Sequence, residues 1–154
     1  MASKGDLKNM YPEYTSDEDL LTRIKSETVD KRKVFILTKG EEGMEIYLPG
    51  VKTPIVIPAI KISTPDGEKL ATVGAGGATL RGLMLALNAM GVHNEETLQR
   101  LTQQQWTVVG KTATIYAAHH LAEQNKIKMK PLLLRRVRGQ LAKPPRLRRV
   151  EPDA

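Results

Sequence analysis

The hydrophobic pattern of this chain changes its period at the glycine-rich stretch 74–77, and this change limits the folds that are open to it. Before the glycines, apolar and polar residues alternate over 44–48, which is the period of a half-buried strand. After them, apolar residues over 80–87 recur at helical spacing. We therefore predict an α+β fold, with small antiparallel hairpins in the first half and a bundle-like helical second half.

Local signals predict where the elements of the first half begin and end. Ser16, followed by three acidic residues, is typical of a helix N-cap and predicts a helix over about 17–27. A segment over 51–57 is interrupted and followed by prolines, so it should lie at a sheet edge or be irregular. We predict one hairpin before this segment, formed by strands 34–38 and 44–48. We predict a second hairpin after it, formed by segments 60–62 and 70–73 around a turn at 64–67.

The second half is predicted to consist of helices. After the glycines, Leu80, Leu83, Met84 and Leu87 share one apolar face, and Gly91 stands where a C-terminal cap belongs. Further helices are predicted from Asn94 to about Gln105, from about Thr107 to Gln124, and from Pro131 to about Leu141. The helix over 107–124 is apolar on both faces, so it should be buried on both, in a core or against another copy.

The length of 154 residues suits one compact domain with a real core. We predict an extended arm over 1–14, a single domain over 15–142, and a basic tail over 143–154. Within that domain, residues 33–73 should be rich in β structure and residues 79–142 helical. The N-terminus carries charges before any apolar run, and the longest uncharged apolar run is too short to cross a bilayer, so we expect a soluble chain.

The positive charge of the chain is concentrated at its C-terminal end. The net charge is +7, and the residues from Lys126 onward include only two acids, Glu151 and Asp153. Arginine suits bidentate phosphate contacts, and such a density of like charge repels itself unless a polyanion is present. We predict that nucleic acid is bound by the ten basic side chains of this segment: Lys126, Lys128, Lys130, Arg135, Arg136, Arg138, Lys143, Arg146, Arg148 and Arg149.

The residue types that carry most enzyme chemistry are scarce. The absence of cysteine excludes thiolate nucleophiles, disulfides and thiolate metal sites. The three histidines are His93, His119 and His120, and neighbours on a helix point about 100° apart, so His119 and His120 do not suit one metal ion. The four serines stand near predicted caps, turns or polar stretches. We therefore predict no catalytic set, no metal and no cofactor.

Two glycine motifs keep a nucleotide-binding alternative open. The stretch 73–79 runs from a predicted strand through glycines into a helix, the setting of phosphate-binding loops, but Thr79 stands where the third glycine would be. Gly110, Lys111 and Thr112 match the end of a P-loop, with Gln105 in place of its first glycine. We interpret the first motif as a flexible connection and the second as coincidence.

Together, these observations favour a non-enzymatic structural protein that self-assembles through its helical half and holds nucleic acid, in a nucleocapsid or coat role. RNA is the expected nucleic acid. We expect contacts to its phosphate backbone, because only 4% of the residues are aromatic and few side chains could stack on bases. Such a protein would reside in a virion, the cytoplasm or the nucleus. The alternatives are a nucleotide-binding protein or enzyme built on Gly74–Gly77 with Lys111 or His120 nearby, and an adaptor whose basic helix over 131–141 meets a membrane or an acidic partner.

Overall fold

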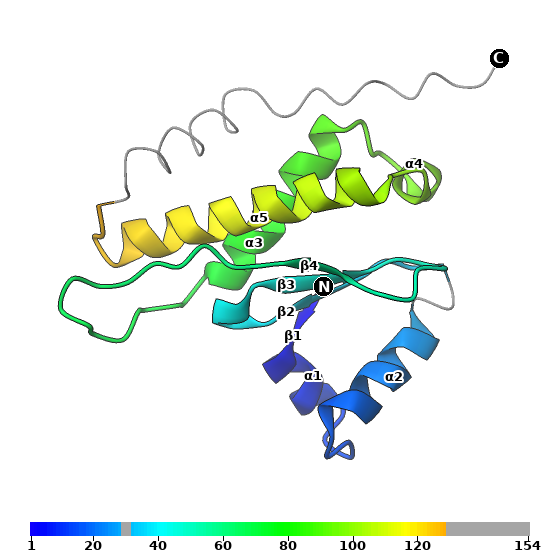
Figure 1. The fold of residues 1–154 in the computed structure, drawn as a ribbon, viewed down its shortest axis with the longest axis horizontal. Helices are drawn as coiled ribbons and strands as arrows, with labels where there is room; N and C mark the ends of the chain where they lie inside the picture. The colour runs from blue at the N-terminus through cyan, green and yellow to red at the C-terminus, as the bar shows by residue number, and fades with distance from the viewer. Residues whose placement is uncertain (29–31, 129–154) are drawn as a thin grey trace. The chain divides into compact units, whose positions relative to one another are not determined.

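The computed structural model describes residues 1–28 and 32–128, and the chain forms two compact units, Met1–Ala59 and Ile60–Ala154. The first unit combines helices with a small mixed sheet, and the described part of the second is helical (Figure 1). The predicted α+β class is therefore confirmed. The predicted single domain over 15–142 and tail over 143–154 extend beyond the described residues and stay predictions.

The first fourteen residues contain regular structure where we predicted an extended arm. A short strand, β1 (Ala2–Ser3), leads into helix α1 (Lys4–Met10). Ser3 and Asp6 form a capping box, in which the Asp6 N–H donates to the Ser3 hydroxyl at 3.1 Å and the Ser3 N–H donates to the Asp6 carboxylate at 3.0 Å. Leu7 is only 4% exposed. The arm prediction was wrong because a short cap and one buried leucine suffice to dock this helix.

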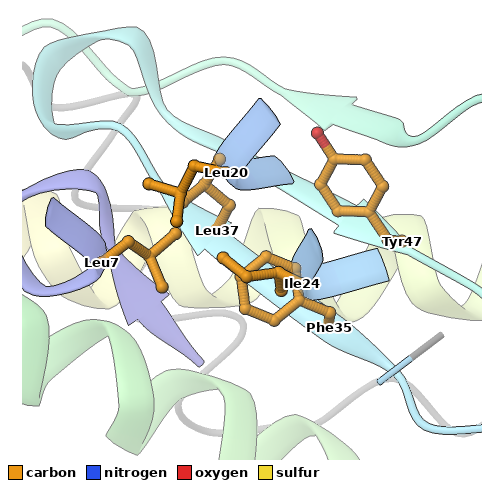
Figure 2. Packing of buried hydrophobic residues seen from close by; sticks show 6 residues of the cluster. All are labelled: Leu7, Leu20, Ile24, Phe35, Leu37 and Tyr47. Atoms are coloured by element: carbon orange, nitrogen blue, oxygen red, sulfur yellow. The ribbon is translucent and has the colours of Figure 1, made fainter. Parts of the chain in front are cut away.

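The core of the first unit lies where α1 and α2 (Asp17–Glu27) meet the sheet (Figure 2). Helix α2 has the predicted bounds, and its N-cap is Ser16, whose hydroxyl accepts the Asp19 N–H at 3.0 Å. Six buried side chains form the cluster: Leu7, Leu20, Ile24, Phe35, Leu37 and Tyr47. Burying side chains of this size contributes about 1.5–3 kcal/mol each, which stabilises the unit.

The sheet of the first unit has the order β1-β2-β3-β4. Strands β2 (Phe35–Thr38) and β3 (Met44–Tyr47) pair antiparallel around a 3₁₀ turn, η1 (Gly40–Glu42), which confirms the first predicted hairpin. Strand β1 pairs parallel to β2. Strand β4 (Ile55–Ile57) pairs with β3 at an edge, as its flanking prolines predicted.

The second predicted hairpin does not form. The turn is present, with the Gly67 N–H donating to Thr64 O at 3.2 Å, but its flanks over 60–62 and 70–73 form no strands. The backbone of Ala71 bonds instead to the Asn125 side chain, 54 residues away. A long-range side-chain contact thus satisfies the groups that a ladder would have used.

The second unit contains α3 (Ala75–Ala89), α4 (Glu95–Gln99) and α5 (Gln103–Gln124). Helix α3 packs closely on α5, because Gly82 lies against the α5 backbone: a Cβ added at Gly82 would lie 2.7 Å from the Ala113 Cα. The face of α3 that packs on α5 is the one that carries Gly82. Two members of the predicted apolar face therefore stay exposed, Leu80 at 46% and Met84 at 61%. Leu83, on the border of the two faces, is buried.

Helix α5 begins earlier than predicted. Its N-cap is Thr102, which forms a capping box with Gln105, so the preceding helix α4 ends at Gln99. As expected for a helix apolar on both faces, α5 is buried around much of its circumference, at Val109, Ala113, Ile115 and Ala118 among others. The predicted helix over 131–141 lies outside the described residues. None of the helices in the described ranges has the length and apolar content that a membrane crossing requires.

Candidate functional site

The segment that leads into α3 is fixed to α5 by two side chains. The Asn125 carboxamide accepts the Ala71 N–H at 2.9 Å and donates to Ala71 O at 3.0 Å. One turn and a half earlier on α5, Nε2 of His120 lies 2.9 Å from Val73 O, a distance at which it donates to that carbonyl. The backbone from Ala71 to Val73 is therefore held along the C-terminal part of α5.

Gly74 begins α3 in a conformation that only glycine takes easily. Its φ is +83°, and it is the N-cap residue of the helix. A Cβ at this position would also lie 2.8 Å from Nε2 of His120. Backbone conformation and available space thus both require glycine here. The backbone at the start of α3 therefore lies close to the imidazole ring of His120.

The first turn of α3 offers free amides to the surroundings. The Ala75 N–H donates to Thr72 O at 3.1 Å and the Ala78 N–H to Gly74 O at 2.9 Å, while no side chain caps this end of the helix. A Cβ added at Gly76 or Gly77 would meet nothing within 4 Å. Uncapped amides and the helix dipole together favour an anion at this position.

Several exposed cationic side chains belong to α3, to α5 and to the residues just after α5. Arg81 is exposed and follows Gly77 by four residues, so both lie on one face of α3. Two further exposed lysines, Lys126 and Lys128, stand one and three positions after Asn125, the residue that holds Ala71. Lys111 is exposed in the middle of α5, away from the first turn of α3. Eight of the ten predicted phosphate-contact residues lie outside the described part of the chain: Lys130, Arg135, Arg136, Arg138, Lys143, Arg146, Arg148 and Arg149.

The structure separates the histidines by role. His119 Nδ1 lies 3.4 Å from a Glu123 carboxylate oxygen, whereas His120 faces the segment before α3. His93 precedes α4, where its backbone N–H donates to Thr97. Over residues 1–28 and 32–128, no three His, Cys, Asp or Glu side chains gather as metal ligands would.

A second polar cluster lies in the first unit. Lys39 Nζ donates to one oxygen of Glu45 at 2.8 Å, and the Tyr47 hydroxyl donates to the other at 2.5 Å. Burial alone would raise the pKa of Glu45, but the hydrogen bonds from Lys39 and Tyr47 outweigh it and lower that pKa. Burial and the bond to Glu45 raise the pKa of Tyr47. These groups satisfy one another, so the cluster stabilises the sheet.

Sequence reasoning identified the glycines of this site and, in the nucleotide-binding alternative, placed Lys111 or His120 near them; the structure brings His120 there, but not Lys111, and adds Asn125, which was missed. His120 and Val73 are 47 positions apart, and Asn125 and Ala71 are 54 apart. No spacing rule links residues at such separations in one sequence. The helical period of 107–124 indicated where His120 lies along α5, but only the glycine-loop alternative suggested what it lies near.

Comparison with known proteins identifies the fold. No family model matches the chain, and no curated protein matches it in sequence. The crystal structure of aminoimidazole riboside kinase from Salmonella enterica, in complex with aminoimidazole riboside and an ATP analog, matches 91% of this chain with a TM-score of 0.59 at 15% identity. Over most of its length, the chain shares the fold of that kinase. A putative ribokinase from Thermoplasma acidophilum matches 81% of the chain with a TM-score of 0.45 at 22% identity, which is too distant to add to the argument.

The match covers only part of those proteins. This chain spans 40% of the Salmonella enterica kinase and 38% of the Thermoplasma acidophilum protein. The similarity therefore concerns less than half of a kinase chain.

The comparison contradicts the hypothesis of a non-enzymatic nucleocapsid or coat protein. The fold is shared with a kinase, so the expectations of a viral structural role and of no enzyme activity were both wrong. That hypothesis depended on the basic C-terminal segment, of which the structure describes only residues 126–128. The nucleotide-binding alternative, built on the glycine stretch, is not contradicted by this comparison.

Proposed function

We propose that this chain binds a nucleotide, with the phosphates placed at the first turn of α3. The observation that carries the proposal is the uncapped glycine turn at Gly76 and Gly77, whose amides face open space. Phosphate groups are among the anions that free amides at a helix N-terminus bind. The kinase of the same fold was solved with an ATP analog, which supports a nucleotide as the ligand.

Rigidity of the turn also supports the proposal. His120 and Asn125 hold the preceding segment at Val73 and Ala71, so the amides do not need to be ordered when a ligand arrives. A preformed site loses less entropy on binding. Arg81, one turn into α3 on the same face as Gly77, adds a cation that suits phosphate oxygens.

Phosphoryl transfer to a small hydroxyl compound is a second candidate function. It is favoured by the fold shared with a kinase that was crystallised with a riboside. A kinase must orient the acceptor hydroxyl and take up its proton as well as bind phosphate. Residues 74–79 contain no titratable side chain, so other residues would supply that role. Release of ADP from ATP in the presence of aminoimidazole riboside or ribose measures this activity.

Nucleotide binding can be tested by calorimetric titration with ATP, with adenosine as the ligand that lacks phosphate. ATP should bind saturably, and adenosine much more weakly. Replacing Gly76 with aspartate places a carboxylate beside the free amides, so ATP affinity should fall at least tenfold. The same change should not unfold the protein, because an acid in the first turn stabilises a helix by about 0.3–1 kcal/mol.

Gly76→Ala is the matched control, because its added Cβ meets nothing within 4 Å and brings no charge. It should retain ATP binding. The proposal is wrong if the unmodified protein shows no saturable ATP binding, or if Gly76→Asp binds ATP as tightly as Gly76→Ala.

Nucleic acid and a second copy of the chain stay predicted partners, with the basic residues from Lys126 to Arg149 as phosphate contacts. Light scattering coupled to absorbance at two wavelengths, on protein purified without nuclease, reports its mass and any nucleic acid that copurifies.

A further inference from the structure

One face of α3 is apolar, exposed and turned away from α5. Leu80 and Met84 on this face are 46% and 61% exposed. Each stands two positions from Gly82, which lies against Ala113 of α5. At 3.6 residues per turn, both side chains therefore point about 160° away from the contact with α5. Large apolar side chains that adjoin one another on a surface mark an interaction site, and α5 cannot cover this one.

The spacing on this face is that of a contact between two helices. Four residues follow one another at intervals of three, four and three positions, and we call them the α3 seam: Gly77, Leu80, Met84 and Leu87. Positions a and d of a coiled coil alternate at these intervals. Leu87 is half-buried, and a Cβ added at Gly77 would meet nothing within 4 Å. So narrow an apolar stripe suits a second helix as its partner.

The α3 seam is complementary to itself across a two-fold axis. Two α3 helices can pack antiparallel with the axis level with Gly82. Leu80 then lies opposite Met84 of the second copy. Gly77, which has no side chain, lies opposite the large side chain of Leu87, as the packing of knobs into holes requires. In a symmetric interface the same patch serves both partners, and the seam meets this condition with its own four residues.

The C-terminal segment of the same chain is too short a distance along the sequence to cover the α3 seam. The N–H groups of Lys126 and Ile127 still bond to carbonyls of α5, so the chain leaves α5 after Ile127. From there to Pro131, where the predicted helix over 131–141 begins, four residues span at most about 14 Å. A helix on the far side of α3 would lie two interhelical distances from α5, about 16–20 Å. The occupant therefore comes from another chain.

We propose that the α3 seam is the contact between two copies of this chain, packed antiparallel at α3. The proposal names a surface for the self-association predicted from the sequence, and it is independent of nucleotide binding. A stable interface uses about 20–30 residues and roughly 800 Å² per partner, far more than the seam offers. The dimer is therefore weak and forms only at high protein concentration.

Arg81 gives this dimer a distinctive salt dependence. It borders the α3 seam one position from Gly82, and the two-fold axis places the Arg81 residues of both copies on the same side of the helix pair. Their repulsion opposes association, and salt screens it. Raising the salt concentration should thus strengthen the dimer. Association through nucleic acid held by the basic segment would weaken instead.

Sedimentation equilibrium of the full chain after nuclease treatment, over a wide range of protein concentration, tests the proposal. The unmodified protein should show a dimer with a dissociation constant in the micromolar to millimolar range. Met84→Lys places a charge in the α3 seam at an exposed position, so the dissociation constant should rise at least tenfold. Leu85→Lys is the matched control, because Leu85 is 42% exposed on the same helix but outside the seam. It should change the constant less than twofold.

The orientation can be tested by disulfide cross-linking, since the chain has no cysteine of its own. Leu80→Cys mixed with Met84→Cys should form a mixed cross-linked dimer under mild oxidation, whereas Met84→Cys alone should not, because its two copies lie beyond disulfide distance in the antiparallel pair. A cross-link between two Met84→Cys chains would overturn the antiparallel arrangement. A monomer at every concentration, or equal weakening by Met84→Lys and Leu85→Lys, would overturn the seam, and neither result would affect the proposed nucleotide binding.

Discussion

Alanine at Gly82 should destabilise the protein, although glycine to alanine inside a helix normally stabilises it. Alanine is favoured over glycine by about 0.8–1.0 kcal/mol in a helix interior. The added Cβ would lie 2.7 Å from the Ala113 Cα and 3.0 Å from the Tyr116 Cβ. The nearer atom belongs to the α5 backbone and does not move cheaply, and overpacking of this kind costs about 1–3 kcal/mol. The difference between these two terms is a net loss of up to about 2 kcal/mol.

Gly77→Ala in the same helix is the control. Its Cβ would meet nothing within 4 Å, so only the helix preference remains and stability should rise by about 0.5–1 kcal/mol. Urea denaturation followed by circular dichroism measures both variants. Gly82→Ala should also weaken ATP binding, since moving α3 from α5 disturbs the contact of Gly74 with His120. A Gly82→Ala protein as stable as Gly77→Ala would refute the close α3–α5 packing.

Three further outcomes are expected. The pKa of Glu45 is lowered in the folded protein, so the stability that its ion pair contributes is present above the ordinary carboxylate pKa and is lost as the pH falls through the lowered value. In acid denaturation curves, Glu45→Gln should therefore lose less stability over this pH range than the unmodified protein does. His120→Ala removes the hydrogen bond to Val73 O, so calorimetry should show ATP affinity reduced severalfold and denaturation a loss of about 1 kcal/mol; unchanged ATP binding would separate His120 from the site. Leu7→Ala should cost about 2–4 kcal/mol in urea denaturation, because Leu7 lies in the core, and a loss below about 0.5 kcal/mol would mean that α1 is not docked as described.

Local signals were enough to predict much of the fold. The Ser16 cap and its acids determine where α2 begins, and the alternation over 44–48 predicts β3, because each depends on neighbours in sequence. The second hairpin failed for the opposite reason, since Ala71 bonds to a side chain 54 residues away. The buried face of α3 was misjudged because close packing at Gly82 favours small residues over Leu80 and Met84.

The candidate site was only half predictable. The glycines of 74–77 are visible in the sequence, but whether they form a flexible connection or a fixed anion site depends on what holds them. His120, which the nucleotide-binding alternative placed nearby, and Asn125, which it did not name, supply that support from α5. The charge pattern was a poor basis for the nucleocapsid hypothesis, because a basic segment is compatible with many partners.

The bond between the Ala71 N–H and Asn125 has a consequence for measurement. Ala71 is exposed, yet its amide hydrogen is engaged by a side chain of another element. Its rate of deuterium uptake therefore reports how often the segment before α3 detaches from α5, and not how often the whole unit unfolds. A single amide thus offers a direct reading of whether occupancy of the site slows that detachment.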